Sequence, residues 1–397
     1  MRISTNAMHL NALRAMLSQQ TALSRTQDQI ASGRRVLSPA DDPIAAVHII
    51  ELERALAESA QFTRNANLAA NRLSLEEQAL ADAGQLLQRV RDLTVQANTA
   101  TIDQSSLEMI ATELRSLLEG LIDVANRRDA HGEYLFAGYS SSAQPFALTG
   151  GGVTYHGDQG VRLVQIAPSQ RVADSHSGYD VFMSVREGNG TFVTEASATN
   201  TGTGIIDPGT VLNHAAWVAD DYTLTFTAAD TWEVTDSGGT VIATGTYTPD
   251  AAIEFNGVRV SITGQPAAGD SFTIRSSRTE DMFAVIGDII ASLREPVASA
   301  ADRALRANRL TAALVQIDQN LDHLSRLRAE VGARLSAVEN SQTFRDDLEL
   351  QLQTTLSELR DLDYAEALTR LNQQYVGLQA AQLSYSQIAR LSLFNYL

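Results

Sequence analysis

Residues 36–44, with the sequence Val-Leu-Ser-Pro-Ala-Asp-Asp-Pro-Ile, decide how the first part of the chain folds. Asp42 is a residue type that favours the N-cap of a helix, and Pro43 fits the first helical position, where its missing N–H costs nothing. Asp41 places a second negative charge near the positive end of the helix dipole. Together with Pro39, these residues predict a helix that begins at Pro43. A metal site is the weaker interpretation, because two adjacent aspartates without a nearby histidine form a poor ligand set.

The chain before this signal has the pattern of a helix over residues 6–31. Met16, Leu23 and Ile30 recur at intervals of seven residues, and this narrow apolar seam is typical of coiled-coil pairing. Gly33 follows the helix and suits the left-handed conformation that often ends one. We therefore expect two successive helices joined by a short acidic turn.

The chain after the signal predicts a second helix over residues 43–98, roughly 80 Å long at the usual rise per residue. A helix of this length does not fit a compact domain, so we expect an elongated molecule. Its apolar face is expected to carry Leu68, Leu75, Ala79, Leu86 and Leu93. A third helix is predicted from the three- and four-residue spacing of Leu107, Ile110, Leu114, Leu117, Leu121 and Val124.

Helical patterns return after residue 279. Pro296 is expected to break the path of the chain, and Ser299 with Asp302 offers a capping box for the next helix. The apolar positions of that helix are Leu310, Leu314, Ile317, Leu321, Leu324, Val331, Leu335 and Val338. The closing helix has a seam that is half polar, and it includes Leu371, Tyr375, Leu378 and Tyr385.

The middle of the chain has strand patterns between turn signals. The expected strands are residues 161–166, 222–227, 232–234, 241–242, 258–262 and 272–274. The predicted fold class is therefore α+β and mainly α: an elongated, coiled-coil-like bundle of long helices from both chain ends, with an inserted β-rich domain. We expect a terminal helical domain of residues 1–36 and 362–397, a long-helix rod domain of residues 37–139 and 280–361, and an outer β-rich domain of residues 140–279.

The two chain ends form thin helices with few apolar residues for burial. Ordering about 65 residues costs much backbone entropy, which a seam this narrow offsets only in part. We therefore expect both ends to complete their folding when neighbouring subunits cover them. The residues predicted for these assembly seams are Met16, Leu23, Ile30, Leu371, Tyr375, Leu378 and Tyr385.

The composition excludes several functional classes. The formal net charge is −17, which argues against nucleic-acid binding because phosphate contacts need basic patches. The chain has no Cys, and all thirty of its basic residues are Arg. Disulfides, thiol nucleophiles and Schiff-base lysines are therefore absent. No segment has the apolar run of a signal peptide or of a membrane span, so we expect neither a cleaved signal nor membrane insertion.

No catalytic, cofactor or metal site is predicted. The closest pair of histidines in sequence, His156 and His176, lies in turn-rich stretches, and no two histidines are four residues apart. One alternative is a helical stalk that carries a glycan-binding β domain, in which Trp217, Trp232 and Tyr222 stack on sugars. The simpler interpretation is that these aromatic residues fill a small β core. We expect the chain not to be an enzyme.

Both ends resemble the flagellin superfamily. The N-terminal likeness rests on residues 3–6, 10–11, 30–35 and 39–43, and the C-terminal likeness on residues 374–382. Residues 39–43, residues 132–138 with Pro145 and Phe146, and residues 391–397 are more similar to hook–filament junction proteins than to flagellins. The likeness covers both helical blocks, and we expect the β-rich insert to carry no part of it.

The resemblance implies a subunit in a ring at the junction of hook and filament, outside the cell. Its neighbours would be hook-associated protein 1, flagellin and copies of itself. It also implies export, escorted by a flagellar export chaperone, through the flagellar type III apparatus. A flagellin of the bulk filament is the alternative within the superfamily.

Overall fold

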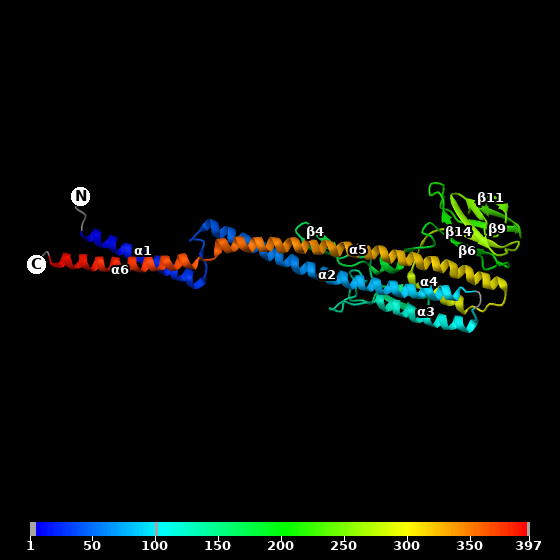
Figure 1. Cartoon of the computed structure of the whole chain (residues 1–397), viewed down its shortest axis with the longest axis horizontal. Helices are drawn as coiled ribbons and strands as arrows, with labels where there is room; N and C mark the ends of the chain where they lie inside the picture. The colour runs from blue at the N-terminus through cyan, green and yellow to red at the C-terminus, as the bar shows by residue number, and fades with distance from the viewer. Residues whose placement is uncertain (1–4, 100–101, 395–397) are drawn as a thin grey trace. The chain divides into compact units, whose positions relative to one another are not determined.

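The computed structural model describes residues 5–99 and 102–394 of the 397-residue chain. It divides the chain into two compact units, which we describe separately: a terminal unit of Met1–Arg64 and Asn340–Leu397, and a central unit of Asn65–Glu339. Helical segments flank a β-rich middle along the chain, which confirms the predicted, mainly helical α+β class (Figure 1). The finer division into three domains stays a prediction.

The terminal unit contains an antiparallel pair of helices, α1 (Thr5–Ser32) and α6 (Tyr364–Phe394), which lie side by side in Figure 1. It also contains the beginning of α2 (Pro43–Ala97) and the end of α5 (Ala300–Arg360). The bounds of α1 and α2 agree closely with the helices predicted for residues 6–31 and 43–98.

Backbone hydrogen bonds join the two connections of the terminal unit. Gly33 ends α1 with a φ of +69°, a conformation that glycine adopts without the penalty of a Cβ atom. The carbonyl of Gly33 accepts a hydrogen bond from the N–H of Leu362 at 3.0 Å, and the N–H of Arg35 donates to the carbonyl of Arg360 at 2.7 Å. The turn after α1 is thereby tied to the link between α5 and α6.

The central unit packs four helical segments around a leucine-rich core: most of α2, α3 (Gln104–Ala125), α4 (Met282–Arg294) and most of α5. The buried face of α2 is centred on Leu73, Leu80 and Leu87, all fully buried. Of the face predicted for α2, Ala79 and Leu93 are buried and Leu75 and Leu86 are half-buried against the core, but the prediction is wrong for Leu68, which is 43% exposed. Two adjacent faces of this helix carry leucines at seven-residue spacing, and only packing decides between them.

The predicted apolar positions of α3 and α5 are confirmed, since most of them are buried and the rest are half-buried. α4 ends before Pro296, as expected. The capping box at the start of α5 is also confirmed: the N–H of Asp302 donates to the Ser299 hydroxyl at 3.1 Å, and the Asp302 carboxylate accepts from the N–H of Ser299 at 2.8 Å.

Short strands in residues 146–186 add to this helical core. They are β1 (Phe146–Thr149), β2 (Gly152–Tyr155), β3 (Leu163–Ala167), β4 (Gln170–Ala173) and β5 (Val185–Arg186), with the π-helical turn η1 (Tyr179–Met183) before β5. β1 pairs with β2, β3 with β4, and β5 with β15 (Thr279–Glu280). Phe146 and Phe182 are fully buried in the same cluster as the leucines of α2.

A second core lies within residues 192–274. An antiparallel sheet has the order β11-β10-β9-β14-β6, and a smaller one has the order β12-β13-β7, with β8 also paired to β13. Their bounds are β6 (Phe192–Ala196), β7 (Ile205–Ile206), β8 (Thr210–Val211), β9 (Tyr222–Ala228), β10 (Thr231–Thr235), β11 (Val241–Thr246), β12 (Ala252–Phe255), β13 (Val258–Thr263) and β14 (Ser271–Ser276).

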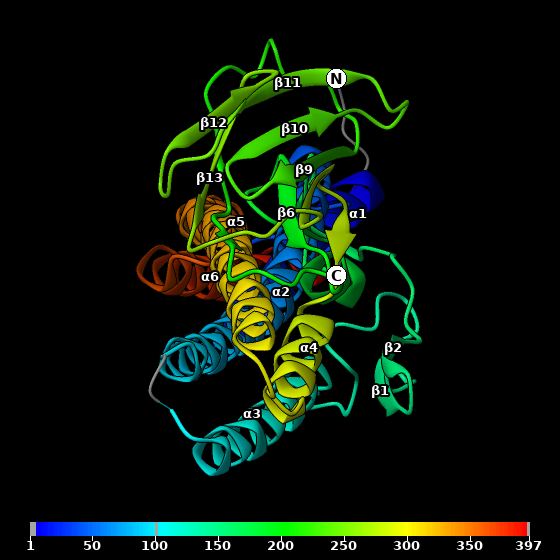
Figure 2. The ribbon, with the colours of Figure 1, turned by 90° about the vertical axis from the view of Figure 1, so that its right-hand side faces the viewer.

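These sheets lie against α5, as Figure 2 shows. Asn308 of α5 makes the connection: its side-chain oxygen accepts from the N–H of Ile206 at 2.8 Å, and its amide donates to the carbonyl of Gly204 at 3.0 Å.

Among the described residues, no helix has both the length and the apolar character of a membrane span.

Candidate assembly interface

The seven residues predicted for the assembly seams all lie on the α1–α6 pair. Six are half-buried: Met16, Leu23, Ile30, Leu371, Leu378 and Tyr385. Tyr375 differs, because it is 56% exposed and points away from the half-buried face of α6, where Gln374 takes its place. Six of the residues are thus partly covered within the terminal unit. Their role toward neighbouring subunits stays a prediction.

The antiparallel register of α1 and α6 is marked by three close approaches. A Cβ atom on Gly33 would lie 3.0 Å from the Tyr364 hydroxyl, and one on Gly377 would lie 3.3 Å from the Gln19 amide nitrogen. Near the other end of the pair, the rings of His9 and Tyr385 meet edge to face at 5.7 Å. Gly33 and Gly377 therefore lie where a Cβ atom would be tight against a side chain across the pair, and His9 and Tyr385 form an aromatic contact near the other end.

The helix-start motif forms a hydrogen-bonded turn. Asp42 Oδ1 accepts from the N–H of Ala45 at 3.0 Å, the geometry of an N-cap. Asp41 Oδ2 accepts from the N–H groups of Leu37 and Ser38, both at 2.9 Å. The bonds from the Ser38 and Leu37 backbone, aided by the charge of Arg25, hold the pKa of Asp41 below its usual value. Asp41 therefore stays ionised in the turn.

Pro39 and Pro43 of the same motif are exposed. Pro39 lies inside the turn closed by the hydrogen bond from the N–H of Asp41 to the carbonyl of Ser38, at 2.9 Å. Pro43 is the first residue of α2. Arg25 of α1 also forms an ion pair with Asp41, so the turn is fastened to the preceding helix.

The terminal unit exposes many large apolar side chains and buries few. A buried apolar cluster is formed by Val36, Ala45 and Ala46, and Leu356, Leu362 and Ala367 are also buried. Its exposed apolar residues are Leu10, Leu13, Leu17, Leu37, Ile44, Val47, Ile50, Phe344, Leu348, Leu350, Tyr364, Leu368, Tyr375, Val376 and Leu383. Large exposed apolar patches are common where a protein contacts another molecule.

Sequence reasoning missed the part of this surface at the start of α2. Ile44, Val47 and Ile50 follow the N-cap at intervals of three residues and are 74%, 55% and 63% exposed. That spacing places them on one side of the helix. The signal was available, because an apolar stripe directly after a polar cap is visible in the sequence. The sequence did not show that this stripe would be exposed, because the fold buries the side of the helix that carries Ala45 and Ala46 instead.

A buried ionic network in the central unit fastens the segment after α3 onto α2. Arg72 is 4% exposed, and its guanidinium lies 2.6 Å from Asp129 and 3.3 Å from Asp174. One turn later on α2, the buried Glu76 accepts from the backbone N–H of His176 at 3.0 Å. His176 is therefore part of a structural network, and no group of three metal-binding side chains occurs among the described residues.

The aromatic residues considered for sugar stacking lie in the second core. Tyr222 is 1% exposed, and Trp217 is half-buried with its ring 5.6 Å from that of Tyr222. Trp232 also packs against this cluster. The arrangement agrees with the interpretation that these residues fill a small β core.

The two ends of the chain match models of flagellar families. Residues 3–141 match the bacterial flagellin N-terminal helical region, and residues 314–397 match the bacterial flagellin C-terminal helical region. Among solved structures, FlgL of Xanthomonas campestris is 39% identical, with a TM-score of 0.70, over 77% of this chain and 99% of that one. This chain belongs to the FlgL family.

Further relatives support this membership in the FlgL family. Hook-associated protein 3 of Legionella pneumophila is 31% identical, with a TM-score of 0.75, over 78% of this chain and 98% of that one. Flagellar hook-associated protein 3 of Escherichia coli K12 is 24% identical over 100% of this chain and 99% of the relative. The flagellin of the same organism is 32% identical over only 34% of this chain. The full-length likeness is therefore to the FlgL family.

One expectation about the β-rich region is wrong. Residues 195–276 match the D2-like domain of flagellar hook-associated protein 1, so the likeness to flagellar proteins extends into the insert. Of the stretches that carry the resemblance in sequence, Ile3, Ser4 and residues 395–397 lie outside the described residues.

Proposed function

We propose that this chain is a structural subunit that forms, with copies of itself, a ring at the hook–filament junction of the bacterial flagellum. The ring adapts the hook to the flagellin filament, and the subunit acts without catalysis. Membership in the FlgL family supports this proposal, because flagellar hook-associated protein 3 of Escherichia coli matches the chain over its full length.

The observation that carries the proposal is the apolar surface of the terminal unit. Ile44 is 74% exposed and Phe344 is 69% exposed, while the buried apolar residues described in this unit are Val36, Ala45, Ala46, Leu356, Leu362 and Ala367. Burying a large apolar side chain is worth about 1.5–3 kcal/mol. Contact with neighbouring subunits would therefore supply the burial that the isolated unit lacks.

The proposed partners follow from a position between hook and filament. Hook-associated protein 1 would contact the ring on the hook side and flagellin on the filament side. The chain would reach this extracellular position through the flagellar type III export apparatus, with an export chaperone bound before export. Its lack of Cys supports this route, because a chain without disulfides passes more readily in an unfolded state.

The terminal helices are proposed to complete their folding on assembly. The two helices leave large apolar side chains exposed, among them Leu17 on α1 and Val376 and Leu383 on α6. We expect the amides of residues 5–32 and 364–394 to exchange rapidly in a dilute monomer and slowly in the assembled ring. Slow exchange of these amides in the monomer would show that the pair folds without neighbours.

Deletion of the gene tests the junction role. Cells without it are expected to carry bare hooks in negative-stain electron micrographs and to release flagellin into the medium, detected by blotting. Bare hooks with no flagellin in the medium would instead identify the chain as the filament subunit. Normal filaments would reject a structural role in the flagellum.

A further inference from the structure

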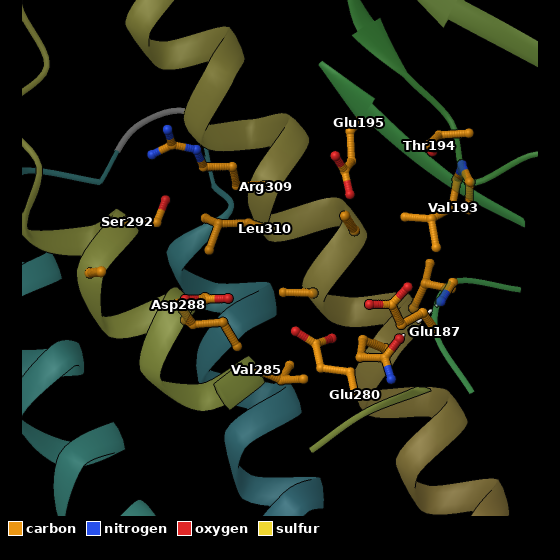
Figure 3. A pocket seen from close by; sticks show the side chains of 18 of the residues that line it. Glu187, Val193, Thr194, Glu195, Glu280, Val285, Asp288, Ser292, Arg309 and Leu310 are labelled. Carbon is orange, nitrogen blue, oxygen red and sulfur yellow. Dashed lines mark hydrogen bonds between the residues drawn. The ribbon is translucent and has the colours of Figure 1, made fainter. Parts of the chain in front are cut away.

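A cavity of about 430 Å³ lies in the central unit, between α4, α5 and the strands β6 and β14. Figure 3 shows Asp288 and Ser292 on α4, Leu310 on α5, and Glu195 of β6 around this space. Its volume falls within the range of roughly 300–1,000 Å³ that is typical of small-molecule sites. One part of the wall is apolar and consists of Val285, Ile289, Leu310, Ala312, Ala313 and Val315.

The remaining wall of the cavity is strongly acidic. It contains five carboxylates, Glu187, Glu195, Glu280, Asp288 and Glu295, and two guanidinium groups, Arg275 and Arg309. The two arginines are already used: Arg275 forms ion pairs with Glu187 and Glu195, and Arg309 forms one with Glu295 at 2.5 Å. Within the described part of the chain, neither Glu280 nor Asp288 forms an ion pair, although the charge of Arg275 acts on Glu280 and that of Arg309 acts on Asp288.

A buried hydroxyl accompanies these two carboxyl groups. Ser292 is 3% exposed, lines the cavity, and has no hydrogen-bond partner for its hydroxyl among the described residues. It lies one helical turn after Asp288, so both side chains are on the same side of α4 (Figure 3). A buried polar group without a partner is costly and uncommon. Ser292 therefore gives a second, independent sign that this cavity receives a polar ligand.

We propose that this cavity binds a small aliphatic cation. Its guanidinium or ammonium group would lie between Glu280 and Asp288 and donate a hydrogen bond to the Ser292 hydroxyl. Its alkyl stem would pack on Val285 and Leu310. The same chemistry is present in a free alkylamine or alkylguanidine and in an arginine side chain of a neighbouring polypeptide. The site does not depend on the proposed assembly surface, since every lining residue belongs to the central unit.

The electrostatics of Glu280 give the site a pH dependence. Burial, with the charges of Glu187, Asp288 and Asp281, raises the pKa of Glu280 to about 7, against the opposing charge of Arg275. The other charged groups around the cavity are the paired Glu195, Glu295 and Arg309. A cation that needs the ionised form of Glu280 binds about tenfold more tightly at pH 8 than at pH 6.

Titration calorimetry of the full-length chain with n-butylguanidinium tests the proposal. We expect saturable binding of one equivalent, and no binding of N-butylurea, which has nearly the same shape without the charge. We expect the affinity to fall at least tenfold in the double variant Glu280→Gln/Asp288→Asn. The control Glu254→Gln removes a carboxylate from an exposed position on β12, outside the cavity, and should change the affinity less than twofold.

The source of the cation is tested with N-acetylarginine amide, which carries the same group on a peptide backbone. Binding within threefold of n-butylguanidinium would identify an arginine of a neighbouring polypeptide, and much weaker binding would identify a free cation. Equal binding of N-butylurea would overturn the proposal, as would equal weakening by Glu254→Gln or the absence of any pH dependence. Circular dichroism of each variant verifies that the fold is retained.

Discussion

The imidazole Nδ1 of His176 lies 2.7 Å from Oε1 of Glu76, a carboxylate with no exposed surface. The Nε2 atom of the same ring lies 3.2 Å from Glu330. Both ring nitrogens therefore face carboxylates, an arrangement that only the doubly protonated imidazolium satisfies as a donor on each side. The contact joins a segment near the start of η1 to both α2 and α5 within the central unit.

This contact predicts a pH-dependent stability. Burial alone would lower the pKa of His176, but its hydrogen bond to Glu76 and the charge of Glu76 raise the net pKa above the ordinary 6.5. The stabilisation is complete below pH 6.5 and is lost as the pH rises through the folded-state pKa. The contribution of His176 to the free energy of unfolding, measured with urea as the difference between the wild type and His176→Gln, should therefore fall above pH 6.5 by at most about 1.4 kcal/mol per pH unit.

The variant His176→Gln should lose the part of the decline that His176 causes and keep the part due to Glu280, whose penalty grows until pH 7, whereas His214→Gln, at an exposed position of the same unit, should retain the full decline. A wild-type decline that His176→Gln leaves unchanged would assign the pH dependence to another group.

Glu280→Gln should stabilise the central unit at neutral and alkaline pH. The pKa of Glu280 is raised to about 7 from an ordinary value of about 4.5, so ionisation opposes folding. The penalty is absent below pH 4.5 and grows until pH 7, where removing it is worth on the order of 2–3 kcal/mol. Thermal or urea unfolding at pH 4.5 and pH 8 measures the change in unfolding free energy that Glu280→Gln causes, and Glu254→Gln is the control. Equal stabilisation at both pH values would contradict the explanation.

Asp302→Ala should destabilise the start of α5. Its carboxylate accepts hydrogen bonds from the N–H groups of Ala298 and Ser299, and losing a cap of this kind costs about 1 kcal/mol. Asp322→Ala removes the same charge from an exposed position in the interior of the helix, where alanine is the better helix former. Urea unfolding should show a loss for the first variant and none for the second. Equal losses would mean that charge, rather than capping, matters at Asp302.

Leu80→Ala and Leu68→Ala distinguish the two leucine faces of α2. Leu80 is fully buried, so its truncation should cost about 2–5 kcal/mol of unfolding free energy. Leu68 is 43% exposed, and its truncation should change the unfolding free energy by about 0.5 kcal/mol or less. A larger loss of unfolding free energy for Leu68→Ala than for Leu80→Ala would show that the buried face is the one that carries Leu68.

The sequence was most informative where the signals are local. The N-cap at Asp42 and the capping box of Ser299 with Asp302 use partners within four residues, so their residue types suffice to place a helix start. The strands β9, β10, β13 and β14 were likewise visible as alternating apolar patterns. Local hydrogen bonds and side-chain periodicity need no knowledge of the rest of the fold.

Contacts between distant segments were not predictable in this way. Arg72 meets Asp129 across 57 residues, and Glu76 meets His176 across 100. Phe146 and Phe182 join the helical core although they lie in turn-rich sequence with weak strand signals. The cavity beside Glu280 and Ser292 likewise requires helices and strands that only the fold brings together. These features depend on tertiary packing, and no pattern along a single element indicates them.

The most direct test of the central claim uses the apolar stripe of α2 in a strain that lacks the chromosomal gene. The variant Ile44→Ser/Val47→Ser/Ile50→Ser removes exposed apolar residues of the terminal unit. The control Leu148→Ser/Leu163→Ser/Leu212→Ser removes residues of the central unit that are 50–59% exposed. Electron microscopy counts the fraction of hooks that carry filaments, and blotting of the medium verifies export of each variant.

We predict that the control restores filaments, whereas the α2 variant is exported but leaves the hooks bare. Filaments at the wild-type frequency with the exported α2 variant would contradict assembly through this surface.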